Sequence, residues 1–156
     1  MTGSRMIPRI RIQAEDFDVA AELAALASGR TDIGAVVSFT GLCRDEGGRL
    51  GALELEHYPG MAEAELGLVA TEAASRWPLQ GLLAIHRYGL IAPGGQIVLV
   101  AAASAHRRAA FEAADFLMDY LKTRAPFWKR EHLSDGTLGD WVEARSEDDD
   151  AARRWN

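Results

Sequence analysis

Residues 82–103 read LLAIHRYGLIAPGGQIVLVAAA, two apolar runs separated by a proline and paired glycines. The runs Leu82–Tyr88 and Gln96–Ala103 are short and rich in leucine, isoleucine and valine, which is typical of buried strands. Ala92-Pro93-Gly94-Gly95 between them is a turn signal. The stretch therefore predicts two consecutive strands joined by a turn.

Helices are expected on both sides of this pair. Upstream, apolar residues recur at helical spacing over Met61–Arg76, and the helix ends before Pro78 because the residue ahead of a proline leaves the helical region. Downstream, a helix is expected from about Ala105 to Arg124, with Ser104 as its N-cap and Pro126 as its stop.

The rest of the chain adds strands and a further helix. Strands are expected at Arg9–Ile12, Ile33–Thr40 and Leu53–Tyr58, and a helix capped by Asp16 runs to about Ser28. The tail from Gly139 contains a short strand candidate and a final polar helix. The order β-α-β-β-α-β-β-α predicts an α+β protein with a largely antiparallel sheet, and residues 1–156 are expected to form a single domain.

Composition excludes several classes of protein. With 48% apolar and 26% charged residues, the chain of 156 residues can bury a core and is not disordered. No apolar run approaches the roughly 20 residues that cross a bilayer, and the single cysteine, Cys43, excludes a disulfide framework or a cysteine-based zinc site. The net charge of −6 has the wrong sign for a nucleic-acid binder. A cytoplasmic protein that binds neither membranes nor nucleic acid is expected.

Basic residues nevertheless gather in one segment of this acidic chain. The segment contains Arg107, Arg108, Lys122, Arg124, Lys129 and Arg130. His106 and the two arginines after it fall in the first turn of the expected helix, where the helix dipole disfavours cations and a bound anion would reverse that penalty. The alternative is that these side chains extend into solvent. We interpret the segment as a local anion site.

Lys122 and Lys129 lie on either side of the expected helix end. The helix dipole accounts for Lys122 but does not reach Lys129, which follows the proline. Phe127 and Trp128 could desolvate a neighbouring ammonium and lower its pKa, which would make it a base or a nucleophile, or they could be core residues.

Other residues carry weaker signals. Cys43 and four scattered histidines show no metal or Cys-His catalytic spacing, and His57 fits a satisfied core histidine. A structural role suits His86 at least as well as a functional one. Arg44, next to Asp45 and a glycine loop, fits an ion pair or a ligand contact equally well.

Several motifs in consistent order resemble one known family. They are Phe39-Thr40-Gly41-Leu42-Cys43-Arg44-Asp45, Leu55-Glu56-His57-Tyr58-Pro59-Gly60-Met61, His86-Arg87-Tyr88-Gly89, Ser104-Ala105-His106-Arg107 and the unbroken run Asp119–Glu131. They resemble the large, catalytic subunit of molybdopterin synthase, and the resemblance covers about Ile33 to Arg145.

The resemblance implies a fold and a set of partners. The fold is an α/β hammerhead with a small additional β-containing subdomain, and the large subunits form a central homodimer. Each binds one small ubiquitin-like sulfur-carrier subunit, giving a heterotetramer, and the carrier's C-terminal Gly-Gly thiocarboxylate enters a pocket. There cyclic pyranopterin monophosphate receives two sulfurs and becomes the dithiolene molybdopterin, with no metal or other cofactor at this step.

The resemblance also assigns roles to residues of this chain. The catalytic lysines of the family match Lys122 and Lys129. Its substrate-binding positions match Arg44, His106 and Arg107, and Arg130 falls within the same basic motif. Arg44, His106, Arg107, Lys122 and Lys129 are expected to converge on one pocket although they lie far apart in the sequence. A non-catalytic scaffold for a ubiquitin-like tail and a phosphate-processing enzyme that acts alone are the remaining alternatives.

Overall fold

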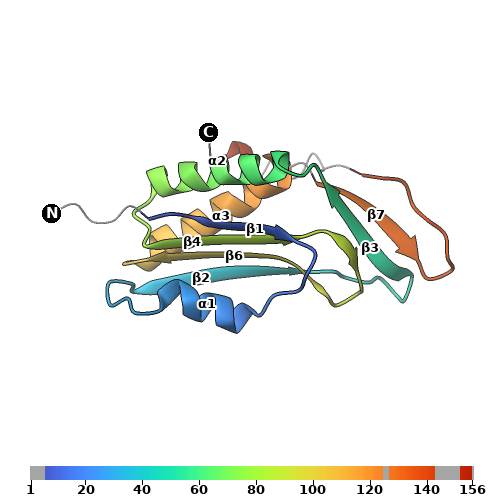
Figure 1. Cartoon of the computed structure of the whole chain (residues 1–156), viewed down its shortest axis with the longest axis horizontal. Coiled ribbons are helices and arrows are strands. Elements are labelled where there is room, and N and C mark those ends of the chain that lie inside the picture. The colour runs from blue at the N-terminus through green and yellow to red at the C-terminus, as the bar shows by residue number, and fades with distance from the viewer. Residues whose placement is uncertain (1–5, 125–126, 143–151, 156) are drawn as a thin grey trace.

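The computed structural model describes residues 6–124, 127–142 and 152–155, and its main sheet has four strands. Their order is β1 (Arg9–Gln13), β4 (Gly81–Arg87), β6 (Gln96–Ser104) and β2 (Ala35–Leu42) (Figure 1). β1 and β4 are parallel, whereas β6 is antiparallel to both of its neighbours. The central strands β4 and β6 are buried along most of their length, which explains their unbroken apolar sequence.

A second, antiparallel sheet lies beyond one end of the main sheet (Figure 1). Its order is β5 (Gly89–Ile91), β3 (Leu50–His57) and β7 (Phe127–Leu133). The tail continues along β7, since Leu138 forms a bridge with His132 and Val142 forms one with Lys129. The expected α+β fold, with a largely antiparallel sheet and a small additional β subdomain, is confirmed.

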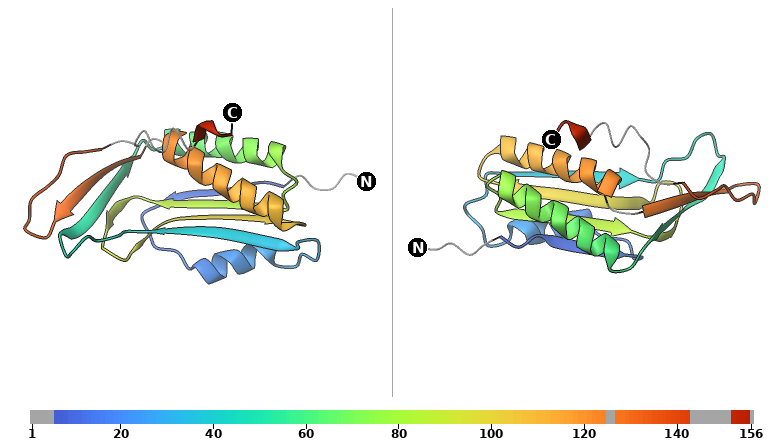
Figure 2. Two further views of the ribbon diagram at one scale, coloured as in Figure 1. Left: turned by 180° about the vertical axis from the view of Figure 1, so that it is seen from behind. Right: turned by 90° about the horizontal axis from the view of Figure 1, so that it is seen from above.

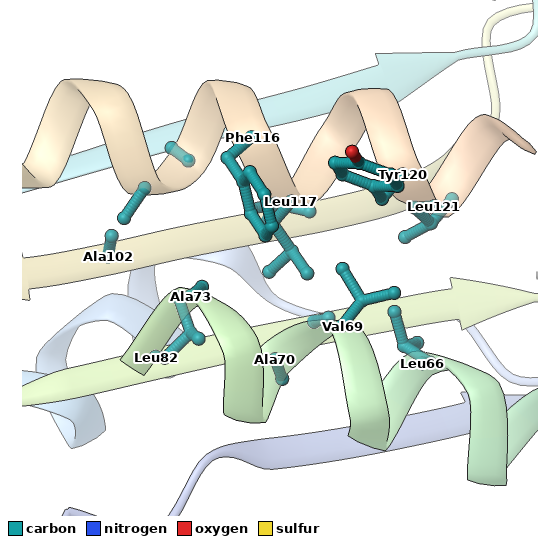
Figure 3. Close-up of a cluster of buried hydrophobic side chains, with 14 of the residues drawn as sticks. Leu66, Val69, Ala70, Ala73, Leu82, Ala102, Phe116, Leu117, Tyr120 and Leu121 are labelled. Atoms are coloured by element: carbon teal, nitrogen blue, oxygen red, sulfur yellow. The ribbon is translucent and has the colours of Figure 1, made fainter. Parts of the chain in front are cut away.

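Helices cover both faces of the main sheet (Figure 2). α2 (Met61–Arg76) and α3 (Arg107–Arg124) pack on one face, and α1 (Val19–Ala27) packs on the other. Fully buried side chains from both long helices, including Leu66 and Phe116, meet over alanines of the sheet (Figure 3). The small alanines allow helix and sheet to approach closely, so this layer is the main core.

The C-terminal residues 152–155 pack on the outer helices. The indole of Trp155 donates a hydrogen bond to Asp119 at 2.6 Å, and its ring contacts Trp77 and Phe116 edge-on. Arg154 pairs with both Asp115 and Asp119 of α3. These contacts attach the end of the chain to the helical layer.

Two predicted helix starts are wrong. Asp18, not Asp16, caps α1 by accepting a hydrogen bond from the amide of Ala21, while Asp16 binds the amide of Phe17 and the side chain of Gln96. Ser104 is the last residue of β6 rather than the N-cap of α3. Its buried hydroxyl donates to the carbonyl of Pro78 at 2.7 Å, and that tertiary contact replaces the cap.

The other predicted elements have mixed outcomes. α2 has the predicted bounds, and the short strand after Gly139 corresponds to the bridge at Val142. β5 and β7 were not predicted. Pro126, the expected stop of α3, and the acidic run at 147–150 lie outside the described residues. Within the described part of the chain, none of the helices combines the length and apolar character needed to cross a membrane.

Candidate functional site

A cavity of about 710 Å³ opens where the two sheets meet the end of α3. Its walls come from the loop after β2, from β3 and β7, from the last turn of α3 and from His86 at the end of β4. Lys122 and Lys129 both line it. The chain has 17 basic residues, and these are its only two lysines.

The fold presents the two lysines in different ways. Lys122 is an exposed residue in the last turn of α3. Lys129 is half-buried in the middle of β7, opposite Leu55 of β3, and its backbone exchanges two hydrogen bonds with Val142 at 3.0 and 2.8 Å. Lys129 therefore has a backbone partner strand on each side.

Two exposed ion pairs stand at the rim of the cavity. Arg44 binds Glu46 at 2.7 Å, and Arg49 lies 3.6 Å from Glu131. Exposed pairs of this kind contribute about 0–1 kcal/mol, so a bound anion can replace either carboxylate at little cost. Arg44 thus forms an ion pair and also lines the cavity, but its partner is not Asp45, whose carboxylate accepts from the amide of Leu50 and closes the glycine loop.

His106 and Arg107 do not reach this cavity within one chain. They line a separate hollow of about 520 Å³ with Arg108, Phe111 and Glu112, at the N-terminal end of α3. At 1.5 Å per helical residue, Arg107 and Lys122 are separated by roughly 22 Å along the helix. A single protomer therefore brings together Arg44, Lys122 and Lys129 only.

Arg130 lies on the opposite face of β7 from Lys129, because side chains alternate along a strand. Its guanidinium donates to Glu54 of β3 at 2.9 and 3.3 Å and lies 4.5 Å above the ring of Trp141. His132 also binds Glu54, at 2.8 Å. Hydrogen bonds from His132 and then Arg130 hold the pKa of Glu54 below its usual range. Arg130 is thus engaged in joining two strands.

Aromatic residues form the floor beside the lysines. Phe127 stacks on His86 with ring centroids 3.7 Å apart, and Trp128 meets Tyr58 edge-on at 5.1 Å. Both Phe127 and Trp128 are half-buried and line the cavity, so each combines a packing role with a place in the site.

Two histidines lie close to the cavity, and one of them differs from the expectation. His57 is not a satisfied core histidine, since within the described residues its enclosed Nδ1 has no hydrogen-bond partner. His86, for which a structural and a functional role were both left open, is 3% exposed and lines the cavity, and burial is the main cause that lowers its pKa to about 3.

Cys43 lines the cavity but is a poor nucleophile. The residue is buried, and burial followed by the charge of Asp45 raises the pKa of its thiol. Among residues 6–124, 127–142 and 152–155, no three histidine, cysteine, aspartate or glutamate side chains are placed to hold a metal ion.

Arg49 and Glu131 are site residues that the sequence analysis did not identify, and His86 was not assigned to the site. No signal of this kind marked those three residues, whereas the two lysines are also marked by the scarcity of lysine in the chain. Arginine serves everywhere else in the chain, and a lysine ammonium, unlike a guanidinium, can lose its proton in a partly dry site.

Known proteins resemble this chain over nearly its whole length. Residues 12–124 match the family model described as MoaE protein. The chain belongs to the MoaE family. Among its relatives, the molybdopterin synthase catalytic subunit of Mesorhizobium japonicum is 71% identical over 150 residues, which cover 96% of this chain and 94% of that protein. The corresponding subunit of Brucella melitensis is 64% identical over 156 residues, and the match covers 99% of this chain and 96% of that protein.

Solved MoaE-family structures have the same fold. The molybdopterin biosynthesis MoaE protein from Burkholderia ambifaria has a TM-score of 0.83 and 50% identity, with 96% of this chain and 98% of that chain covered. The molybdopterin synthase from Staphylococcus aureus has a TM-score of 0.73 and 30% identity, with coverage of 84% and 94%.

Proposed function

We propose that this chain is the catalytic subunit of a molybdopterin synthase. Small ubiquitin-like carriers present their C-terminal Gly-Gly thiocarboxylates, each of which brings one sulfur, and cyclic pyranopterin monophosphate receives two sulfurs in turn to become the molybdopterin dithiolene. The observation that carries this proposal is the placement of the chain's only two lysines in one cavity. The names of the catalytic subunits that it resembles over nearly its whole length support it.

The chemistry of the cavity suits two anionic ligands. The cyclic phosphate and the thiocarboxylate both need cationic hydrogen-bond donors in a partly dry site, where such contacts are strongest. Arg44 at the rim exchanges Glu46 for one of these anions. Lys129, held between two backbone partners, stabilises the acyl intermediate or transfers a proton as the substrate ring opens, together with Lys122.

The carrier supplies the sulfur, so the enzyme needs no thiolate of its own. This agrees with the raised pKa of the buried Cys43 thiol. A tail that ends in two glycines can bring its backbone close to the cavity wall, because glycine has no side chain to exclude it. A cytoplasmic location is part of the same proposal.

A homodimer gives His106 and Arg107 a role in the same reaction. We assign them to the anion site of the partner protomer, since they lie far from the lysines of their own chain. Apolar side chains that a second copy could cover are exposed nearby: Val36 and Phe39 on the edge strand β2, and Phe111 beside the second hollow. Arg130, paired with Glu54, holds β7 in place.

The main experiment is a single-turnover assay with thiocarboxylated carrier and pyranopterin. Lys129→Ala should reduce the rate by about 10²–10⁴-fold, the usual contribution of a positioned proton-transfer group, while the thermal melt stays close to that of the wild type. Arg124→Ala is the matched control, because Arg124 is an exposed cation near Lys122 that packs on Tyr120 and does not line the cavity. Near-normal turnover by a folded Lys129→Ala protein would reject the catalytic assignment.

Mixed dimers test the shared site. Neither Lys129→Ala nor Arg107→Ala should support turnover alone. A heterodimer of the two contains one intact site, made of Lys129 from one protomer and Arg107 from the other, and should regain activity. If mass spectrometry shows that heterodimers form and activity does not return, the assignment of Arg107 to the partner's site is wrong.

A further inference from the structure

His86 is a buried polar residue that the proposed reaction has not yet used. It is the sixth residue of β4 and 3% exposed, and it lies at the junction between the main sheet, α3 and β7. One ring face is covered by Phe127 at 3.7 Å. Packing alone would be satisfied by a phenylalanine or leucine, so the two ring nitrogens need an explanation.

The first nitrogen is accounted for by the backbone. Nδ1 lies 2.8 Å from the carbonyl oxygen of Arg87. A carbonyl oxygen only accepts hydrogen bonds, so Nδ1 carries the proton, and in the neutral ring Nε2 then presents a lone pair.

The second nitrogen, Nε2, has no hydrogen-bond partner among the described residues. Within the described residues the bond to Arg87 is the only hydrogen bond of His86. The fully enclosed, unpaired side-chain polar atoms of that same part of the chain are His57 Nδ1 and Gln80 Oε1. Nε2 therefore has no hydrogen-bond partner among the described residues, and the side chain that carries it lines the cavity.

We propose that Nε2 of His86 is a ligand-binding acceptor, which receives a hydrogen bond from an amide-type N–H of a molecule bound in the cavity. The inference rests on the proposed function, which offers two sources of such a donor: the backbone of the carrier tail and the ring of the pterin. A neutral acceptor complements the cations of the cavity, which recognise only the anionic parts of these ligands.

The electrostatics keep this acceptor unprotonated. Burial is the main cause of the low pKa of His86, about 3, and the charges of Lys122 on α3 and His57 on β3 lower it further. The imidazole is thus neutral at every pH at which the protein would work. It cannot serve as a general base that stores a proton, and its contribution is to binding and orientation.

Two substitutions of His86 distinguish the roles of its two ring nitrogens. His86→Gln can place an amide oxygen near the position of Nε2 and loses the local donor to Arg87. His86→Asn keeps a donor near Nδ1 and has no atom at Nε2. A purely structural histidine would tolerate Asn better than Gln, whereas a ligand-binding Nε2 requires the opposite order.

The measurements are the Kd of carrier with an ordinary C-terminal carboxylate, by calorimetry, and the KM for pyranopterin with thiocarboxylated carrier. His86→Asn should weaken one of the two by about tenfold, the effect of one lost hydrogen bond, while His86→Gln stays within about twofold of the wild type. An increase in Kd assigns the donor to the carrier tail, and an increase in KM assigns it to the pterin. Equal behaviour of Asn and Gln in both measurements, or better retention by Asn, overturns the inference.

A measurement on the wild-type protein tests the proposal even if the His86 variants do not fold. In long-range ¹H–¹⁵N spectra, Nε2 of His86 should have the shift of an unprotonated nitrogen, and that shift should move when carrier or pyranopterin is added. An Nε2 signal unchanged by both ligands overturns the inference while the proposed function stands. Wild-type protein that neither binds carrier nor converts pyranopterin overturns both.

Discussion

The two sheets of this protein are stabilised by different means. The main sheet lies between helices, and its central strands β4 and β6 bury apolar side chains on both faces. In the second sheet, β3 and β7 are mostly half-buried, with the cavity on one face and Glu54, Arg130 and His132 on the other. The comparison indicates that the main sheet carries most of the apolar core, whereas the second sheet supplies Lys129 and much of the cavity wall.

The largest expected effect comes from breaking the main core. Leu66→Ala should lower the free energy of unfolding by about 2–5 kcal/mol, because Leu66 is fully buried between α2 and the sheet. Leu68→Ala, two residues further on the same helix, is the matched control. Leu68 is 60% exposed, so its loss should change stability by no more than about 0.5 kcal/mol. Urea denaturation gives the free energy of unfolding of both variants. Similar decreases for the two would contradict the proposed location of the core.

An intermediate effect is expected from the charged face of the second sheet. Glu54→Gln should cost about 1–2 kcal/mol at pH 7, because it weakens the charged hydrogen bonds from Arg130 and His132. The pKa of Glu54 is lowered in the folded state, so its contribution is present above the ordinary value of 4.5 and is lost as the pH falls through the folded value.

Denaturation of the wild type and of Glu54→Gln, from neutral pH to below the folded-state pKa of Glu54, checks the direction of this pH dependence. The two stability curves should converge at low pH, where the wild-type carboxylate is protonated as well. Glu56→Gln is the control, since Glu56 is exposed and forms no ion pair with any residue that the structure describes. A difference between wild type and Glu54→Gln that stays constant with pH would exclude the ionised carboxylate as its cause.

The smallest effect is expected at the rim of the cavity. Arg44→Ala should change the free energy of unfolding by less than about 0.5 kcal/mol, since its pair with Glu46 is exposed, with 82% and 65% of the two side chains accessible. Arg30→Ala is a close match, because Arg30 binds Asp32 at the same 2.7 Å and the same spacing of two residues. Only Arg44→Ala should raise the KM for pyranopterin. Equal KM values for the two variants would remove Arg44 from the anion site.

The sequence predicted the apolar elements better than the strand that bears Lys129. α2 was predicted with its observed bounds because its apolar period and Pro78 act locally. β7 was missed because its inward face carries Lys129 and Glu131, which line a cavity rather than a core, so no apolar alternation marks the strand. Ser104 was misread because its partner, the carbonyl of Pro78, is distant in the sequence.

The candidate site was also predicted in part. The resemblance assigned both lysines, and the structure brings them together with Arg44. The expected convergence of all the cations does not occur within one chain. The length of α3 alone, at 1.5 Å per residue, was enough to separate Arg107 from Lys122. The sequence could not predict that His86 lines the same cavity as the two lysines, because that depends on how the two sheets meet.

The scarcity of lysine gives the cavity a natural chemical label. Apart from the amino terminus, every primary amine of the chain lies in this one place. An amine-selective dye or cross-linker therefore becomes a reporter of site occupancy without any engineered residue. A lysine-specific protease has two cleavage positions in the whole protein, and both lie at the cavity wall, so resistance to digestion would measure directly how well a bound carrier covers it.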